Sequence, residues 1–415
     1  MLDKENTPIG DGSALELLCA RLGQIPVGSQ KISNFGFPTA WDSFSESDWE
    51  KLVARAQSEG LAPLMYWTLS KFSWLSTVPE MLREPLRLNY GISQLHNKSI
   101  WQELESLAPA LNQAGIPIVL LKGVCFALTI YPDMGLRPMG DLDILVPFSR
   151  LQEAVKIAVT LGYRIAVPDA SPGLKDLLNH EVCLMKAGSQ PLLLEIHHSL
   201  VADRSFRYAV PVDWFWEQVV PLETAWVKAR DLDLFMLTPT AQVLYAAAHA
   251  MLQHGGKNAP LRWFYDLDRL IRSYDKSLDW NLLLSQARLF DWGSALEAAL
   301  VHTQAWFKTP IPEKVLAGLA GETDRHQELV ARRQVRPATH LLEEFEKMLS
   351  LNWYGRIRLL GALLVPSPAY MRWRYKLKTS WAIPAYYGIR WVGIIVDGFR
   401  SLVSLFRKNI PDSDH

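Results

Sequence analysis

Two aspartates separated by one residue, Asp141 and Asp143, have the types and spacing best suited to metal chemistry in this chain. They begin an apolar run, Asp141–Val146, which predicts a β-strand. Because side chains alternate between the two faces of a strand, both carboxylates should lie on the same face. Adjacent carboxylates repel each other, and a divalent cation between them would remove that repulsion. The pair therefore predicts a metal site, whereas a bare Asp-x-Asp sequence is more often a solvated turn.

A third acidic residue, Glu195, lies in another predicted strand, Leu192–His197, which is expected to form a hairpin with Glu181–Lys186. Glu195 shares one face of its strand with His197. If both strands belong to one sheet, Glu195 can lie beside the aspartate pair, complete the metal site and accept a proton. An exposed strand residue is the alternative interpretation of Glu195. His197 would bind substrate or hold Glu195, and an ordinary hydrogen-bonded histidine is an equal alternative.

Phosphate binding is indicated upstream by Lys122 and Gly123. They interrupt an apolar run, Ile116–Leu121, which predicts a buried strand, and a helix is expected over Val124–Tyr131. Gly123 would let the backbone approach a phosphate at the helix N-terminus, and Lys122 would neutralise a phosphate oxygen. An ordinary strand-to-helix turn is the alternative. Arg137 would bind a phosphate through two hydrogen bonds or neutralise the aspartate pair.

The stretch that contains these residues reads LLKG…YPDMGLRPMGDLDILV. It resembles a bacterial family of uncharacterised, or family 5, nucleotidyltransferases within the polymerase β-like superfamily. The resemblance extends to LLLEIHHSL and LYAAAHAMLQHGGKNAPLRWFYDLDRLI, although its specific part is Lys122–Val146. Val124 is a departure, because the wider superfamily usually has a serine there that contacts the triphosphate.

The resemblance implies an enzyme that transfers a nucleoside monophosphate from an NTP to an acceptor hydroxyl and releases pyrophosphate. The acceptor stays open, although family members are associated with polysaccharide or peptide natural-product pathways. Two Mg²⁺ ions are the implied cofactors, and the implied catalytic residues and metal ligands are Asp141, Asp143 and Glu195. The other implied roles are nucleotide binding and substrate binding, by Lys122, Gly123, Arg137 and Arg262 for the nucleotide and by His197 for the substrate.

Two other functional classes stay open. A degenerate transferase fold that serves as a binding or scaffold module would explain Val124, although the acidic set argues against it. A metal-dependent glycosyltransferase also uses Asp-x-Asp. In that class the pair typically follows a hydrophobic strand and has a parallel sheet behind it, whereas here the pair opens a strand directly after Gly140.

The pattern of apolar residues predicts strands between helical regions, an α+β fold that is mostly helical. The resemblance implies that the strands form a small mixed sheet of the nucleotidyltransferase type with flanking helices. The expected segments are a helical N-terminal domain at 1–110, the nucleotidyltransferase-like core at 111–215, a helical domain at 216–350 and a basic, aromatic helical segment at 351–415.

Bulk properties restrict the partners and the compartment. The formal net charge is zero, which disfavours a nucleic-acid-binding protein. The partners that the resemblance implies are an NTP and an acceptor. Cys19, Cys125 and Cys183 are far apart and have apolar neighbours, which indicates reduced core residues rather than disulfides or a zinc site. No secretory signal pattern or long apolar run is evident, so we expect a cytoplasmic protein without a transmembrane helix.

Two sets of residues further along the chain have weaker signals. His249 and His254 are five apart, so on a straight α-helix they would not share a face, and a two-histidine metal site is not expected. Arg262, Asp266 and Arg269 line one face of a predicted helix. They are expected to form a solvated, paired surface or, from the resemblance, a cleft wall where Arg262 meets nucleotide phosphates.

The C-terminal stretch Leu351–Ile410 combines eleven aromatic residues with ten Lys or Arg and one acid, Asp397. Basic residues together with Trp and Tyr on an amphipathic helix suit an anionic membrane surface. Peripheral attachment to the inner face of the membrane is therefore one expectation. The alternatives are packing of the aromatics against the helical domain and a groove on a partner protein.

Overall fold

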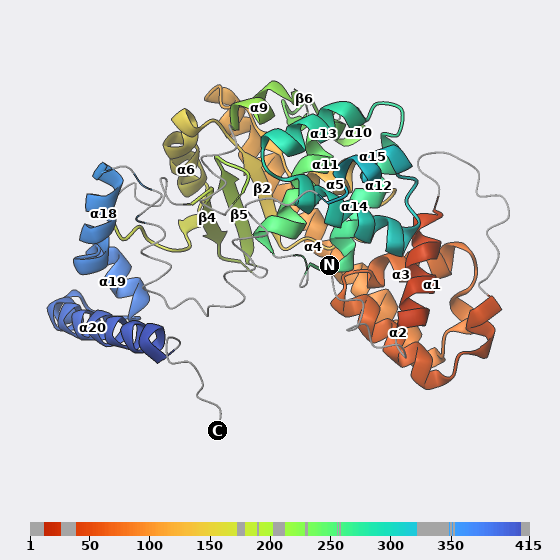
Figure 1. The fold of residues 1–415 in the computed structure, drawn as a ribbon, viewed down its shortest axis with the longest axis horizontal. Helices are drawn as coiled ribbons and strands as arrows, with labels where there is room; N and C mark the ends of the chain where they lie inside the picture. The colour runs from red at the N-terminus through yellow and green to blue at the C-terminus, as the bar shows by residue number, and fades with distance from the viewer. Residues whose placement is uncertain are drawn as a thin grey trace.

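The computed structural model describes residues 12–25, 39–171, 179–188, 191–201, 212–228, 231–254, 256, 259–321, 348, 351 and 353–407. Parts of all four predicted segments therefore lie outside the described residues, and the longest such part is residues 322–347. Figure 1 shows the N-terminal helices at one end of the molecule, the sheet near the middle and the last helices at the opposite end.

The centre of the molecule is a seven-stranded mixed sheet in the order β3-β4-β5-β2-β1-β7-β6. Its strands are β1 (Val119–Leu120), β2 (Asp141–Leu145), β3 (Arg164–Ile165), β4 (Glu181–Lys186), β5 (Leu192–His197), β6 (Val219–Pro221) and β7 (Phe235–Leu237). The pairs β2–β5 and β1–β7 are parallel, and the other neighbours are antiparallel. The predicted α+β fold with a mixed sheet is confirmed.

The two central strands have one apolar and one polar face, as alternation requires. Leu142 and Ile144 of β2, with Leu194 and Ile196 of β5, are fully buried on the apolar face. Helix α6 (Leu151–Thr160) buries residues at positions i, i+3, i+4 and i+7, which form one helical stripe. The apolar face therefore holds the sheet in the core and leaves the opposite face for the polar residues.

Helices of the N-terminal part precede the sheet: α1 (Gly12–Gly23), α2 (Glu46–Ser58), α3 (Ala62–Lys71) and α4 (Glu80–Gln113). A capping box between Ser45 and Asp48 fixes the start of α2. On the long helix α4, the buried Asn97 donates hydrogen bonds to the backbone oxygens of Met134 and Arg137, at 2.6 and 2.8 Å. This helix therefore holds the loop that leads into β2.

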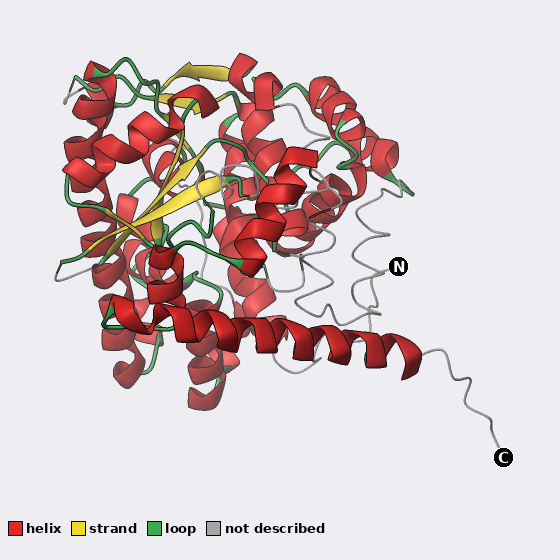
Figure 2. Cartoon of the chain, turned by 90° about the vertical axis from the view of Figure 1, so that its left-hand side faces the viewer, coloured by secondary structure: helices red, strands yellow, loops and turns green. Residues whose placement is uncertain are grey.

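The helix α5 (Lys122–Thr129) joins β1 to that loop. The helices after β5 are α9 (Val212–Glu217), α10 (Ala225–Lys228), α11 (Pro239–Ala248), a π-helical turn (His249–Gln253), α12 (Leu261–Ser273), α13 (Trp280–Leu289), α14 (Gly293–Phe307) and α15 (Glu313–Leu319). The C-terminal helices are α18 (Trp353–Leu364), α19 (Pro368–Arg374) and α20 (Ile383–Arg407), and Figure 2 shows α20 as a long, straight helix. Within the described residues, no helix combines the length and apolarity needed to cross a membrane.

Three sequence expectations about local structure need correction. The predicted strand Ile116–Leu121 forms ladder pairs only at β1, because Lys122 already begins a helix. Helix α5 thus starts two residues before the predicted Val124. The segment 216–350 is not purely helical, because β6 and β7 extend the sheet beyond β1.

Candidate active site

The polar face of the sheet collects carboxylates from three adjacent strands. In the parallel pairing of β2 with β5, Asp143 lies directly opposite Glu195. In the antiparallel pairing of β4 with β5, Cys183 lies opposite Glu195 and Glu181 lies opposite His197. Opposite residues in a sheet project to the same side, so these side chains form one cluster, the acidic cluster. The structure thus places Glu195 beside Asp143.

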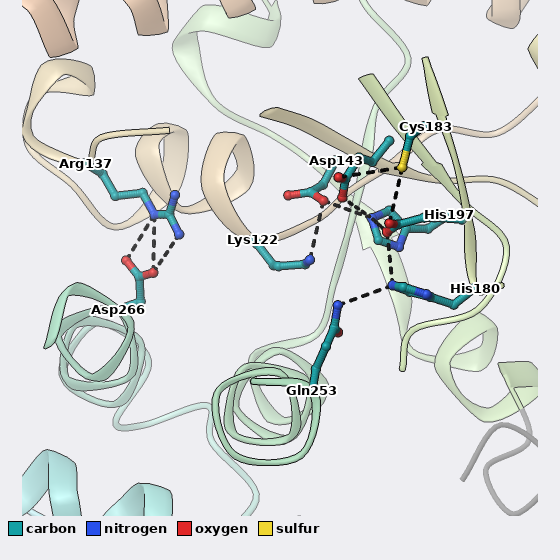
Figure 3. Close-up of polar contacts among 10 residues, drawn as sticks. Lys122, Arg137, Asp143, His180, Cys183, His197, Gln253 and Asp266 are labelled. Atoms are coloured by element: carbon teal, nitrogen blue, oxygen red, sulfur yellow. Dashed lines mark hydrogen bonds and ion pairs between the residues drawn. The ribbon is translucent and has the colours of Figure 1, made fainter. Parts of the chain in front are cut away.

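His197 lies in the middle of the acidic cluster and is fully buried. Its Nε2 is 2.9 Å from Asp143 Oδ1, 3.4 Å from Glu181 Oε2 and 3.6 Å from Glu195 Oε2. Burial alone would lower the pKa of His197, but its hydrogen bonds to Asp143 and Glu195 raise that pKa to about 9. The imidazole is therefore a cation held among three carboxylates, as Figure 3 illustrates for its contact with Asp143.

Lys122 supplies a second positive charge. Its Nζ is 3.4 Å from Asp143 Oδ1 and 5.7 Å from the ring centroid of Tyr245. Burial would lower the pKa of Lys122, and the Asp143 charge outweighs that effect and raises it. Burial would likewise raise the pKa of Asp143, but Lys122 and His197 hold it well below its usual range. The backbone of Lys122 has a φ of 37°, which lies in the left-handed region. Its side chain contacts Asp143 rather than open solvent.

The pKa values of the other three carboxyl groups are shifted in different directions. Burial raises the pKa of Glu195 to about 7, although His197 opposes the shift. Burial and the Asp143 charge raise the pKa of Asp141. For Glu181, burial is outweighed by the hydrogen bond with His180, and the pKa falls to about 2. Together with Asp141, the cluster has four carboxyl groups and two basic neighbours, Lys122 and His197, a composition that favours binding of a cation.

The donor set of the acidic cluster fits a divalent metal. Ligand atoms of Asp143, Glu195 and His197 lie within 4.8 Å of one another. Two further groups within that distance share these residues: His180, Glu181 and His197, and Glu181, Cys183 and Glu195. Carboxylate oxygens are the ligands that Mg²⁺ and Mn²⁺ prefer, while imidazole and thiolate suit softer metals. Asp141 is on the same strand face but belongs to none of these groups among the described residues.

Arg137 forms a buried ion pair with a residue of a later helix. Its guanidinium is buried and binds Asp266 of α12 through Nε and Nη2, at 3.2 and 2.9 Å from Oδ2. The hydroxyl of Tyr131 donates to Oδ1 of the same carboxylate at 2.7 Å. In this structure Asp266 pairs with the guanidinium of Arg137, and phosphate binding by Arg137 stays a prediction (Figure 3).

Gly123 also has a different role. It has no positive φ, and a Cβ at this position would lie 2.8 Å from Arg137 Nη1 and 3.2 Å from the side chain of Met139. The small residue therefore makes room for Arg137 and Met139. The prediction that Gly123 is needed for close approach of a phosphate has no support in its surroundings.

The predicted solvated surface on α12 is wrong for two of its three residues. Asp266 and Arg269 are buried, and Arg269 pairs with Asp268 and donates to the backbone oxygen of Ile25. Arg262 differs, because its Nε is buried and has no hydrogen-bond partner among the described residues. Burial and then the charge of Arg137 lower the pKa of Arg262. Such a guanidinium suits an anionic ligand.

The two histidines after α11 also correct an expectation. The π-helical turn has a wider repeat than an α-helix, and it brings the rings of His249 and His254 to 4.6 Å between centroids. Trp263 packs against both rings, at 4.7 Å from each. The side chain of Gln253, in the same turn, lies 3.4 Å from His180 Nε2. The turn thus borders the acidic cluster, although it supplies no member of the three ligand groups.

The residues that the sequence analysis missed are Glu181, His180 and Cys183. Glu181 and Cys183 alternate in a strand that was expected at Glu181–Lys186, so they share a face. The hairpin pairing with β5 then places that face beside Glu195. The alternation of side chains in the sequence shows that Glu181 and Cys183 share a face, but only the register of the hairpin shows that this face lies beside Glu195.

The family model described as "Uncharacterised nucleotidyltransferase" matches residues 45–308. No curated protein matches the chain. A solved structure of an antigenic nucleotidyltransferase-like protein from Paracoccidioides brasiliensis is similar at 13% identity and a TM-score of 0.29, over 48% of this chain and 92% of that chain.

Proposed function

We propose that this chain, which belongs to the family of uncharacterised nucleotidyltransferases, transfers a nucleoside monophosphate from an NTP to an acceptor hydroxyl in a metal-dependent reaction. The observation that carries the proposal is the in-register pair Asp143 and Glu195 on parallel strands, with Asp141 on the same face. A buried carboxylate set of this kind is suited to divalent cations that bind triphosphate.

The proposed roles of the residues are metal binding, proton transfer and phosphate binding. Asp141, Asp143 and Glu195 would hold the metal, and Glu195 would accept the proton of the acceptor hydroxyl. Two bound Mg²⁺ ions would neutralise charge on the phosphates and on the attacking oxygen. Lys122 and Arg262 would bind phosphate oxygens, and His197 would hold the carboxylates in position through its contact with Asp143.

The cysteines support a reducing compartment, and we propose a cytoplasmic location. Cys19 and Cys125 are buried and Cys183 is half-buried, and none of the three forms a disulfide. The polysaccharide or peptide pathway and the identity of the acceptor have no structural counterpart among the described residues. The mixed sheet, in which β2 is antiparallel to β1, does not favour the glycosyltransferase alternative.

Thermal unfolding with each NTP, with and without Mg²⁺, tests the proposal. A ligand present at 100 times its Kd adds about 2.7 kcal/mol of stability, which is readily measured as a rise in Tm. We expect a rise that requires both NTP and Mg²⁺ in the wild type. Asp141→Asn should lose it, whereas Asp42→Asn, which changes an exposed carboxylate in an N-terminal 3₁₀ turn, should keep it.

The same measurement separates the alternatives. A rise with NTP and Mg²⁺ but no pyrophosphate release, even with a broad set of hydroxyl acceptors, would favour the binding or scaffold protein. A rise only with nucleotide sugars would favour the glycosyltransferase. No metal-dependent rise with any NTP would contradict the proposed function.

A further inference from the structure

The C-terminal stretch 353–396, which contains α18, α19 and the first half of α20, exposes an unusual number of large apolar side chains. Trp381 is 83% exposed, Trp353 is 73% and Ile395 is 70%. The other exposed members are Tyr354, Ile357, Leu360, Leu364, Val365, Trp373, Ile389, Trp391, Val392 and Val396. We call this set, together with the three above, the apolar surface. A soluble domain seldom leaves so many such side chains in water unless the surface binds something.

Helix α20 presents its part of the apolar surface on one side. Trp391, Val392, Ile395 and Val396 follow the spacing i, i+1, i+4 and i+5, which places them along one face of the helix. Arg390 and Asp397 lie on the other side by the same spacing. The helix is therefore amphipathic, and its apolar face is exposed.

The exposed parts of α18 and α20 adjoin each other. The indole N–H of Trp391 donates to the backbone oxygen of Leu364 at 2.6 Å, and Arg390 Nε donates to that of Leu363 at 2.9 Å. The apolar side chains at the end of α18 thus lie beside those of α20. These contacts join the end of α18 to α20 within the apolar surface.

Positive charge accompanies the apolar surface. The stretch 351–396 contains no acidic residue. The exposed Arg374 ends α19, and the exposed Lys376 and Lys378 follow directly after it. Leu351–Ile410 contains ten Lys or Arg and one acid, so the rest of a chain with zero net charge has a balance of minus nine. A surface with negative charge would attract the C-terminal helices and repel the remainder, which gives attachment one orientation.

We propose that α18, α19 and α20 dock on an anionic lipid surface, with α20 lying in the plane of the interface. An amphipathic helix with Trp and basic residues inserts its apolar face to the boundary of headgroups and acyl chains. No described helix is suited to crossing the bilayer, so the attachment is peripheral. The hydroxyl of Ser367 donates to the backbone oxygen of Asp169 at 2.6 Å, which links the docked helices to the loop after β3.

Co-sedimentation of the full chain with vesicles tests the docking. With vesicles that contain about one-third phosphatidylglycerol in phosphatidylcholine, the protein should pellet at low salt and be released as salt screens the charges. With phosphatidylcholine alone, binding should fall on the order of tenfold or more, because the basic side chains gain nothing there. Equal partitioning into both vesicle types, or no binding to either, would overturn the proposal.

Two pairs of variants with matched controls locate the contact. Ile395→Glu places a charge on the apolar face of α20, and Leu289→Glu makes the same kind of change at an exposed residue of α13. The double variant Arg374→Glu/Lys378→Glu removes charge from the C-terminal helices, and Lys98→Glu/Lys314→Glu does so elsewhere on the surface. The first member of each pair should weaken binding to anionic vesicles on the order of tenfold.

The controls should bind as the wild type does, and all variants should keep the wild-type Tm. If the C-terminal variants sediment with vesicles like the wild type, the proposal fails. It also fails if Ile395→Glu only converts a dimer to a monomer in analytical ultracentrifugation, because the apolar surface would then be an interface between two copies. None of these readouts depends on nucleotide transfer.

Discussion

Arg137 and Asp266 are 129 residues apart in the chain, yet they form an ion pair with two hydrogen-bonded nitrogens and are both buried. The pair joins the loop before β2 to helix α12. It therefore fixes the position of the acidic cluster relative to the helices that follow the sheet.

Breaking the Arg137–Asp266 pair should cost stability rather than nucleotide affinity. Arg137→Met leaves the Asp266 carboxylate buried without its partner, which should lower the free energy of unfolding by about 3–5 kcal/mol. The double variant Arg137→Met/Asp266→Leu should recover part of that loss in urea unfolding. If Arg137→Met keeps full stability and weakens only NTP binding, the guanidinium binds phosphate after all.

Asp141 and Asp143 should differ in stability although both should be needed for metal binding. Burial and the Asp143 charge disfavour ionised Asp141, so Asp141→Asn should leave stability unchanged or slightly higher. Asp143→Asn removes the partner of buried Lys122 and His197 and should lower stability by about 3 kcal/mol or more. Urea unfolding without metal measures both, and equal effects would contradict this assignment.

Gly123 should be sensitive to the smallest enlargement. In Gly123→Ala the new methyl group would lie 2.8 Å from Arg137 Nη1, so the buried ion pair must shift, at a cost of about 1–3 kcal/mol. Gly140→Ala is the matched control, because its Cβ would meet nothing within 4 Å. The Tm of each variant is compared with that of the wild type. An unchanged Tm in Gly123→Ala would show that the packing around Gly123 tolerates a methyl group.

Arg262 should affect nucleotide binding more than folding. Its Nε has no described hydrogen-bond partner, so Arg262→Met should change the free energy of unfolding little. If it binds a phosphate, the Kd for NTP with Mg²⁺ should rise on the order of tenfold, since a charge-assisted hydrogen bond contributes about 1.5–3 kcal/mol. Titration calorimetry measures this change, and Arg262→Lys should retain part of the affinity. An unchanged Kd would remove Arg262 from the nucleotide site.

His249 should make the fold less stable in acid. Burial, followed by the charge of Lys122, lowers the pKa of His249 well below 6.5, so the folded state keeps it neutral. Below pH 6.5 the unfolded chain binds a proton that the folded chain does not, and stability falls as pH falls, by up to about 1.4 kcal/mol per pH unit. His249→Gln should reduce the loss measured by urea unfolding between pH 7.5 and 5.5. An equal loss of stability in the variant would show that His249 is not the source of the acid sensitivity.

Alternation along a strand is a local property, and the sequence alone therefore determined which side chains share a face. It placed Asp141 with Asp143 and Glu195 with His197, and the strands Glu181–Lys186 and Leu192–His197 have the predicted bounds. The pattern of apolar residues also predicted an α+β chain, whereas the mixed sheet was implied by the family resemblance. The amphipathic character of the C-terminal helices is likewise periodic and local.

The tertiary structure alone decided which faces meet. The parallel pairing that sets Asp143 opposite Glu195 joins strands about fifty residues apart, and no local pattern fixes that register. Asp266 forms an ion pair with Arg137 because the fold buries both side chains, and an unpaired buried charge would destabilise the folded state. The histidines at 249 and 254 share a face only because the helix widens to a π turn there. Such contacts depend on packing between distant segments, which sequence spacing does not encode.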